Sequence, residues 1–316
     1  MAVGVWRLAF GAIINHNYFM LSYLQSHAGE LAALSVSFFW TFSALYFDKA
    51  GRRIGSLSVN IIRIFLSIFM LGIMTMITRG MFFPTDATSE SWFWLSLSGF
   101  VGFFLGDLML FHSYSVIGSR TSTLIMSLHP MITVVIGWFF LAEILSMLSI
   151  VAILISISGI MIAISNKNMK LNIPLKGFLL AFGGAMGQAV GLILSKKGMG
   201  DYDPIAATQI RAIFGFISFA VFITVLGRWS RVFKGIRDME GMKAISIGTF
   251  AGPVAGVSLS LFAIQHTQTG IASMLMGLVP IMIIVPSAIM FNEKIKPRQV
   301  IGAVISILGA SLFFIP

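Results

Sequence analysis

The chain has 316 residues, of which 57% are hydrophobic and only 10% are charged, whereas a soluble globular protein carries about 25% charged residues. This excess of apolar side chains excludes a soluble single-core domain and predicts an all-α integral membrane protein. The net charge of +10 comes from basic residues beside apolar spans, so no nucleic-acid partner is expected, and the absence of cysteine excludes disulfides and thiolate chemistry.

Residues 1–28 are predicted to be an interfacial lead-in rather than a span or a signal peptide. Their apolar run is short, Arg7 is the only early positive charge, and the polar stretch Asn15–Asn17 interrupts the run. A signal peptide has a basic start and a small-residue cleavage site, and neither is evident here. A mis-assigned start codon is the alternative explanation of this segment.

Ten apolar windows follow, each close to the length of about 20 residues that a helix needs to cross a bilayer. They cover 30–47, 56–78, 91–112, 120–141, 145–165, 176–195, 204–226, 243–264, 270–291 and 298–315. Short connections predict an up-and-down bundle, with a first five-helix repeat at 29–165, a linker at 166–175 and a second repeat at 176–316. Only 227–242 is long enough for a separate surface segment, predicted to lie on the membrane as a basic amphipathic stretch rather than to bind a partner.

Two charged residues lie deep inside the predicted spans of the first half. Of the 11 acidic residues, Asp107 alone sits well inside a span, and Arg63 lies at a comparable depth on the preceding, antiparallel helix. Charged groups at membrane depth cost about 2.5–3.5 kcal/mol on insertion scales and mark a pathway or a partner. Three interpretations stay open: Arg63 snorkels to the interface while Asp107 caps a loop, the two form a structural ion pair, or the pair breaks in response to substrate or proton.

A proline interrupts the fourth predicted span, in the stretch MSLHPMITVVIGWFFLAE (126–143). His129 precedes Pro130, and Pro280 lies near the middle of the fourth span of the second half. An interior proline frees a backbone carbonyl that lipid cannot satisfy, so symmetric kinks around a midplane cavity are predicted. His129 either lines this cavity, in contact with substrate or proton, or is satisfied by hydrogen bonds between helices. No second ligand at suitable spacing supports a metal site.

Small residues recur at four-residue spacing on three predicted helices, a pattern that lets helix backbones approach closely. These close-packing stripes contain Ser98, Gly102 and Gly106; Gly183, Gly187 and Gly191; and Gly248, Gly252 and Gly256. Tight packing within the bundle and sliding surfaces for moving helices are both compatible with the stripes.

The two halves repeat each other at a fixed offset of 150 residues. The matching positions are Gly102 and Gly252, Gly106 and Gly256, Pro130 and Pro280, Glu143 and Glu293, Ser156 and Ser306, and Gly159 and Gly309. Arg63 aligns with Arg211 at an offset of 148. Because each half contains five spans, an odd number, the second half must be inverted in the membrane relative to the first. Two inverted five-helix repeats are the architecture of secondary transporters, in which the halves exchange roles during alternating access.

The polar candidates are not duplicated, which predicts an asymmetric cavity. Arg211 keeps its place in the second half, but the position equivalent to Asp107 is Val257. Similarly, Val279 stands at the position equivalent to His129.

Two further side chains are candidates for the pathway. Gln188 and Trp40 occupy equivalent regions of the first helices of the two halves. Either could reach the cavity, as a hydrogen-bond donor or as an aromatic wall, and the helical phase leaves both possibilities open.

Loop charges predict the orientation in the membrane. Fifteen lysines and arginines fall in the loops of one side, whereas the opposite side holds Arg7, Arg79, Lys196 and Lys197. Cytoplasmic loops carry the excess of positive charge. Both termini are therefore predicted to face outward from a cell membrane.

These features resemble the drug/metabolite transporter superfamily, and in particular its EamA-type ten-helix branch. The resemblance rests on GRRIG after the first helix (51–55), GDLMLF in the third (106–111), and a fourth helix with small residues and proline that ends in Glu143. It covers residues 29–316 and implies a secondary transporter, commonly an exporter of amino acids, metabolites or drugs, with a central cavity between the halves. Better-known ten-helix members are drawn with cytoplasmic termini, so the predicted orientation departs from the family's pattern.

Catalytic signatures are missing from the sequence, which contains no HExxH, nucleophile elbow, phosphate-binding loop or paired intramembrane carboxylates. We therefore expect no enzyme, no cofactor and no metal, and predict a permease that exports a small organic metabolite or drug by alternating access. Its expected partners are the lipid bilayer and a small-molecule substrate, with proton coupling and the choice between monomer and oligomer left open. The alternative is a multi-pass sensor or membrane enzyme that uses the same bundle as a scaffold.

Overall fold

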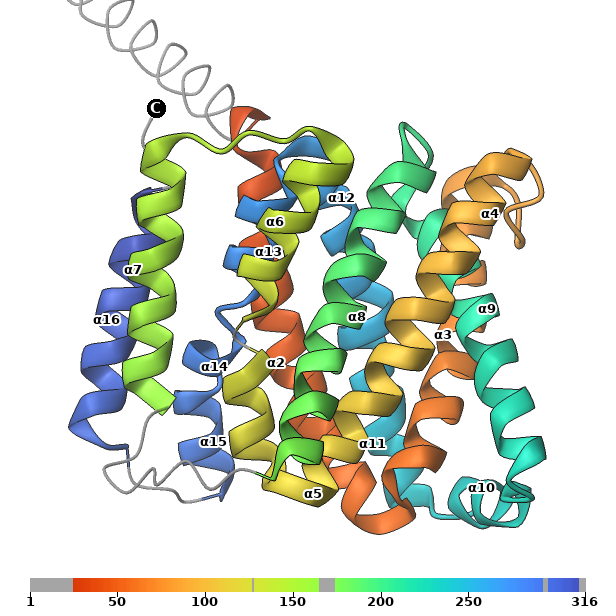
Figure 1. Ribbon diagram of the computed structural model, residues 1–316. Coiled ribbons are helices and arrows are strands. Elements are labelled where there is room, and N and C mark those ends of the chain that lie inside the picture. The colour runs from red at the N-terminus through yellow and green to blue at the C-terminus, as the bar shows by residue number, and fades with distance from the viewer. Residues whose placement is uncertain (1–24, 127, 165–173, 292–294, 313–316) are drawn as a thin grey trace, which may run out of the picture.

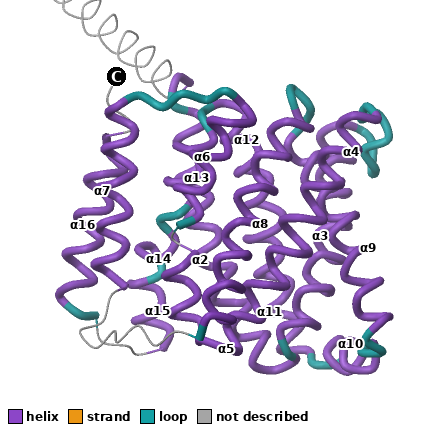
Figure 2. Tube along the Cα trace, in the orientation of Figure 1, coloured by secondary structure: helices purple, strands orange, loops and turns teal. Residues whose placement is uncertain are grey.

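The structure, a computed structural model, describes residues 25–126, 128–164, 174–291 and 295–312. This part of the chain consists of helices and loops and contains no strand (Figures 1 and 2). Residues 1–24 of the predicted lead-in, the linker as far as residue 173, and Glu293 lie outside the described residues.

Both halves follow one plan, in which the third helix of each is a long run with a π-helical centre. The first half contains α2 (Ala28–Ile54), α3 (Ser56–Arg79), the run α4 (Ser89–Ser98), η1 (Gly99–Gly106) and α5 (Asp107–Met126), then α6 (His129–Leu141) and α7 (Met147–Ile164). The second half contains α8 (Leu175–Met199), α9 (Pro204–Val225), the short α10 (Trp229–Ile236), the run α11 (Met239–Thr249), η2 (Phe250–Gly256) and α12 (Val257–His266), then α13 (Thr269–Met276), α14 (Val279–Met282), α15 (Ile284–Phe291) and α16 (Pro297–Ser311).

Carboxylate caps fix helix starts at the two ends of the bundle. Asp203 precedes Pro204 and accepts a hydrogen bond from the amide of Ala206 at 2.8 Å. Asp238 caps α11 in the same way and accepts from the amide of Gly241 at 2.8 Å. The first amides of a helix have no partner within it, so these side chains satisfy donors that would otherwise be unpaired.

Six described helical runs are long and apolar enough to cross a bilayer. They are Ala28–Ile54, Ser56–Arg79, Ser89–Leu110, Leu175–Met199, Pro204–Val225 and Met239–His266. Two shorter apolar helices cover His129–Leu141 and Met147–Ile162. The structure thus differs from the ten predicted full-length spans chiefly in the last two elements of each half.

The fourth element of each half is broken rather than kinked. α5 continues through residues 113–119, where the sequence predicts a connection, and α6 begins only at His129. Pro130 is therefore the second residue of α6, and Pro280 is the second residue of α14. Proline suits the first turn of a helix, because the amide that it lacks would have no partner there. A new helix start accommodates each proline without the freed carbonyl of a kink.

The π-helical segments occupy matching places in the two halves. η1 has eight residues and η2 has seven, and they end at the repeat-related Gly106 and Gly256. π turns inside α-helices are rare and occur frequently at functional sites. The repeat therefore extends to a backbone feature that the side-chain pattern does not predict.

The third helix of each half packs against the first helix of the other half. A Cβ atom built on Gly187 of α8 would come within 2.7 Å of the Cα atom of Gly106 on η1. At the matching crossing, a Cβ atom on Gly256 of η2 would come within 2.5 Å of the Trp40 indole on α2. The halves are thus interlocked, and both π-helical segments lie where they cross.

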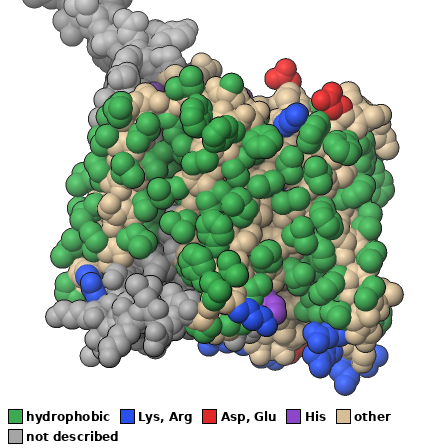
Figure 3. Space-filling model, in the orientation of Figure 1, with side chains coloured by type: hydrophobic (Ala, Val, Ile, Leu, Met, Phe, Trp, Pro, Cys, Tyr) green, Lys and Arg blue, Asp and Glu red, His purple; other side chains and the backbone are tan. Residues whose placement is uncertain are grey.

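The outer surface suits a lipid environment. Figure 3 shows hydrophobic side chains over most of one face, with Lys and Arg gathered along its lower edge. Phe139, Phe140 and Val225 are 71%, 74% and 79% exposed. Apolar exposure on this scale is incompatible with water and is typical of a surface that contacts lipid.

The last helices of the two halves, α7 and α16, stand side by side at one edge of the bundle (Figure 1). A Cβ atom on Gly159 would come within 2.4 Å of the Ser306 amide nitrogen, and one on Gly309 within 2.5 Å of Ser156 Oγ. Ser156 Oγ also donates a hydrogen bond to the Ser306 carbonyl at 3.2 Å. Repeat-related residues thus meet each other reciprocally, and small residues allow the close approach.

We predict that Gly159→Ala destabilises the protein by about 1–3 kcal/mol, because the new methyl group meets backbone atoms of α16 that can yield only by separating the helices. Gly51→Ala is the matched control, since a Cβ atom on Gly51 of α2 has nothing within 4 Å. Thermal unfolding of both variants in one detergent measures the difference. Equal midpoints would contradict the tight α7–α16 contact.

Candidate functional site

The π-helical segment η1 brings Asp107 to the crossing between the halves. η1 ends at Gly106, and Asp107, which is only 7% exposed, is the first residue of α5. A Cβ atom on Gly106 would lie 3.4 Å from the backbone of both Gly187 and Gln188. Backbone contact at these glycines therefore places α8 of the second half beside the Asp107 carboxylate.

Side chains from both halves hold Asp107. Arg63 Nη2 on α3 donates to Asp107 Oδ2, and Gln188 Nε2 on α8 donates to Asp107 Oδ1 at 2.9 Å. Arg63 Nε also donates to Asn60 Oδ1 at 2.9 Å, and Gln188 Nε2 donates to the Gly102 carbonyl at 3.3 Å. The side chains of Arg63 and Asp107 are 12% and 9% exposed, so neither reaches solvent freely. Both carboxylate oxygens are occupied.

Arg211 of α9 adds a second guanidinium to this cluster. It is 4% exposed, and its Cζ lies 4.7 Å from the centroid of the Phe103 ring on η1. Its Nε is buried and has no hydrogen-bond partner among the described residues. Its charge acts on that of Asp107, whose oxygens accept their hydrogen bonds from Arg63 and Gln188 and not from Arg211.

Two other predicted pathway residues lie apart from this cluster. Trp40 packs on Gly256 at the matching crossing of the other half. His129 is half-buried at the start of α6, where its carbonyl accepts a hydrogen bond from Thr133 Oγ1 at 2.9 Å, and no hydrogen bond within the described part of the chain joins it to Asp107. The candidates that the structure brings together are Arg63, Asp107, Gln188 and Arg211.

The cluster makes the partners of Asp107 depend on how the halves are arranged. Arg63 and Asp107 belong to the first half, whereas Gln188 and Arg211 belong to the second. Any displacement of α8 and α9 relative to η1 must change the contacts of the carboxylate. The site can therefore couple a change of charge to a movement of the halves.

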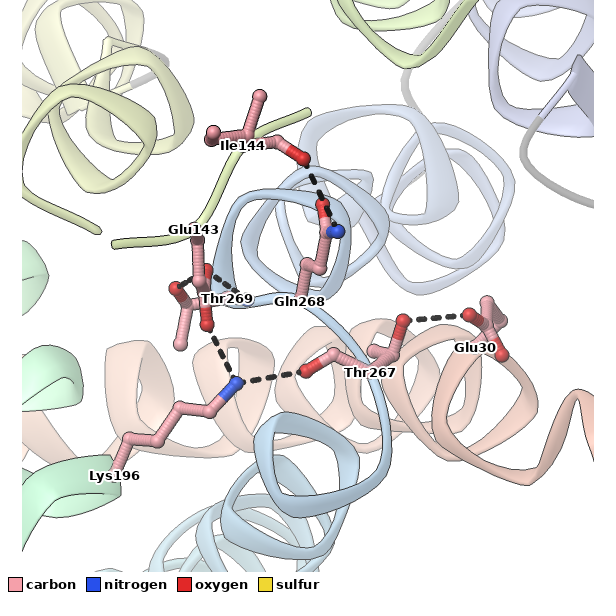
Figure 4. Close-up of polar contacts among 7 residues, drawn as sticks. All are labelled: Glu30, Glu143, Ile144, Lys196, Thr267, Gln268 and Thr269. Carbon is pink, nitrogen blue, oxygen red and sulfur yellow. Dashed lines mark hydrogen bonds and ion pairs between the residues drawn. The ribbon is translucent and has the colours of Figure 1, made fainter. Parts of the chain in front are cut away.

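A second polar cluster joins the halves at the end of the bundle that is uppermost in Figure 1, here called the upper end. Figure 4 shows this cluster in close-up. Lys196 Nζ, near the end of α8, donates to Glu143 Oε1 at 2.6 Å and to the Thr267 carbonyl at 3.1 Å. Glu143 Oε2 accepts from the amide of Thr269 at 2.9 Å and from its hydroxyl. Thr267 Oγ1 donates to Glu30 Oε1 at 2.6 Å. The two glutamates come from the first half and their partners from the second.

Tyr202, in the α8–α9 connection, joins the halves at the same end. Its hydroxyl accepts a hydrogen bond from Arg79 Nη1 at 3.1 Å and donates to Asp86 Oδ1 at 2.8 Å. Gln265 Nε2 donates to the Tyr202 carbonyl at 3.3 Å. Burial raises the pKa of Tyr202 to about 12, so its hydroxyl remains a donor at neutral pH.

We did not predict either of these upper clusters from the sequence. The sequence marks Glu143 as a repeat-matched residue at the end of the fourth predicted span, and Lys196 as one of four basic residues on the less basic side. Their pairing depends on how α6 of one half meets α8 of the other, which no pattern within a single helix specifies.

Comparisons with known proteins agree with this fold. The profile of the EamA-like transporter family matches residues 27–165 and 175–315. An uncharacterized transporter of Clostridium kluyveri is 25% identical over 221 residues, which are 69% of this chain and 70% of that protein. An uncharacterized transporter of Archaeoglobus fulgidus is 33% identical over 107 residues, which are 34% of this chain and 36% of that protein. A solved crystal structure has a similar fold, with a TM-score of 0.68 over 90% of this chain and 96% of that one, at 16% identity.

Apolar helices of this length, with charges buried where two repeated halves cross, define a multi-pass membrane protein of the transporter class. One family profile matches both halves of the sequence. The chain belongs to the EamA-like transporter family, and the resemblance seen in its motifs is confirmed. The family and the names of the relatives favour a transporter over an enzyme.

We predict that Asp107→Asn and Arg63→Gln each lower the free energy of unfolding by about 3–5 kcal/mol, because each change leaves the partner's buried charge without its hydrogen-bonded counterion. The double variant should lose less than the sum of the two single changes. Unfolding in detergent measures the four proteins of this cycle, with Glu90→Gln on the exposed first turn of α4 as a neutral control. Additive losses would mean that Arg63 and Asp107 are not coupled.

Proposed function

We propose that this protein is a secondary transporter that exports a small organic metabolite or drug, with ten spanning segments arranged as two inverted five-helix halves. The observation that carries the proposal is the buried cluster at the crossing, where Asp107 contacts Arg63 in its own half and Gln188 in the other. A static scaffold gains little from such a cluster, since apolar residues of similar volume often stabilise a core as well or better. Ionisable groups at membrane depth mark substrate and proton pathways, and a cluster shared between two repeated halves is placed to respond when the halves move in alternating access.

The two ends of the bundle are closed to different degrees. At the upper end, the side chains of Glu143 and Lys196 are 13% and 26% exposed and share hydrogen bonds with the α12–α13 connection. At the lower end, Arg53 pairs with Asp238 at 3.0 Å, but their side chains are 47% and 27% exposed. Exposed ion pairs contribute little to stability. Of these two ion pairs in the described part of the chain, the upper one is the less exposed, and the Glu143–Lys196 pair is the proposed gate that must break for the upper end to open.

Charge on the surface supports one orientation of this gate. Lys and Arg gather at the lower edge in Figure 3, and the excess of positive charge faces the cytoplasm in most membrane proteins. The lower end then faces the cytoplasm, and the upper gate and both termini face outward from the cell membrane.

Solute flux in proteoliposomes tests transport. Liposomes with the purified protein are loaded with a panel of amino acids, organic acids, nucleosides, sugars and cationic drugs. We predict that at least one solute leaves faster than from protein-free liposomes, and that Asp107→Asn strongly reduces this flux because Arg63 loses its ionised partner. Glu90→Gln should retain it. If the folded protein moves no solute of the panel, the alternative of a multi-pass sensor or membrane enzyme takes precedence.

Cysteine labelling tests the gate. The chain contains no cysteine, so a single Ser273→Cys on α13, one turn from Thr269 and fully buried, reports opening of the upper end. We predict that Glu143→Gln accelerates its labelling by a membrane-impermeant maleimide on intact cells several-fold. Lys197→Gln is the control, because the ammonium of Lys197 lies over the Trp94 ring, 4.0 Å from its centroid, and not in the gate.

If Glu143→Gln leaves the labelling rate of the cysteine at position 273 unchanged, the Glu143–Lys196 pair is not part of the gate. Labelling in inside-out vesicles but not in intact cells would place the upper end at the cytoplasm and reverse the proposed orientation.

A further inference from the structure

The central cluster carries one more positive than negative charge. Within the described residues it contains the guanidinium groups of Arg63 and Arg211 and the carboxylate of Asp107, all largely shielded from solvent. Asp107 is bonded by Arg63 on one oxygen and by the neutral Gln188 on the other. Arg63 and Asp107 thus balance each other, and the charge of Arg211 is left over.

Arg211 lacks the acceptor that a buried guanidinium requires. Its Nε is enclosed and unpartnered in the described structure, and its planar group lies against the Phe103 ring. Such stacking stabilises a desolvated cation by about 2 kcal/mol, but it provides no acceptor for the N–H groups. A buried charge without a hydrogen-bonded partner costs several kcal/mol, and a ligand that supplied an acceptor would remove this cost.

Gly102 of η1 lies beside the Arg211 guanidinium. A Cβ atom built on Gly102 would lie 3.5 Å from Arg211 Nη2, which is ordinary van der Waals contact. Any longer side chain at this position would therefore lie across the guanidinium. Glycine at position 102 therefore places no side chain of η1 over this nitrogen.

We propose that Arg211 binds the carboxylate of a transported monocarboxylate, a solute with one carboxylate and no second charge. The N–H groups of arginine form a planar fork that matches a carboxylate with two parallel hydrogen bonds, and Nε is one arm of that fork. One carboxylate neutralises the one surplus charge, whereas a phosphate dianion would leave a buried negative charge uncompensated. The inference rests on the proposed transport function and names the substrate class of the same site.

Arg211 also stands where an anion can act on both halves. It belongs to α9 of the second half, and the ring under its guanidinium belongs to η1 of the first. A carboxylate bound at Arg211 would compete with the Asp107 carboxylate for interaction with the positive charges of Arg63 and Arg211. Binding is therefore linked to the contacts that change when the halves move.

Acids and their neutral amides provide the test, because the members of each pair share a shape and differ in charge. The pairs are benzoate and benzamide, phenylacetate and phenylacetamide, and hexanoate and hexanamide, each titrated against the thermal unfolding of the purified protein. We expect at least one acid to raise the unfolding midpoint in a saturable manner while its amide does not. Arg211→Gln should weaken the apparent affinity for that acid roughly tenfold or more, the loss expected for a charge-assisted hydrogen bond.

Two further variants separate binding from folding. Arg211→Lys keeps the charge but loses the fork, so its affinity for the acid should lie between those of the wild type and Arg211→Gln, and it serves alone if Arg211→Gln does not fold. Lys234→Gln, which removes an exposed cation on α10, should bind the acid as the wild type does.

Several results would overturn the assignment. They are equal stabilisation by acid and amide, no stabilisation by any acid of the set, stabilisation only by inorganic phosphate or zwitterionic amino acids, and unchanged acid affinity in both Arg211 variants. The site and the transport function fail separately. Flux of neutral solutes that depends on Asp107, without acid binding, removes the Arg211 site and leaves transport. Acid binding that depends on Arg211, without flux of that acid, leaves the site and removes transport.

Discussion

Charge at membrane depth is the constraint on which the rest of this structure depends. Hydrocarbon offers no hydrogen bond to a carboxylate or a guanidinium, so Asp107 and Arg211 can be accommodated only inside the bundle. Gln188 reaches Asp107 because Gly106 and Gly187 let η1 and α8 come into backbone contact. The small-residue stripes and the buried charges are therefore parts of one arrangement, in which close packing provides the partners that lipid cannot.

The two halves share a backbone and differ in what they place on it. η1 and η2 end at matching glycines, and each lies against the first helix of the opposite half. In the first half, Asp107 follows the π-helical segment. In the second half, Val257 follows it, and the preceding Gly256 packs on the Trp40 indole. The two halves thus share a backbone plan, and within the described residues only the π-helical segment of the first half is followed by an acidic residue.

The sequence was most informative where the physics is local. An ion pair between Arg63 and Asp107 was one of three interpretations that the sequence left open, because the two lie at similar depth on consecutive antiparallel helices. The repeat could be found because Gly, Pro and Glu match in order. Pro130 could not be placed correctly, because a proline in an apolar run is compatible with both a kink and a helix start, and the choice depends on where α5 ends. The hydrogen bond between Glu143 and Lys196 could not be predicted. It joins two residues 53 positions apart in the chain, and it depends on how the segments that carry them dock.

The unbalanced guanidinium of Arg211 also gives the protein an electrical character. With the monocarboxylate site proposed above, an empty centre would bear a net positive charge, whereas a loaded centre would be neutral. Moving one elementary charge through a potential of 100 mV changes the free energy by about 2.3 kcal/mol, and a neutral centre feels no such force. The voltage-sensitive half of the cycle is then the return of the empty carrier rather than the passage of the loaded one. For the exporter proposed above, in a cell that is negative inside, the membrane potential would draw the empty centre toward the cytoplasm, where it could load again, and so would favour export without a second bound ion.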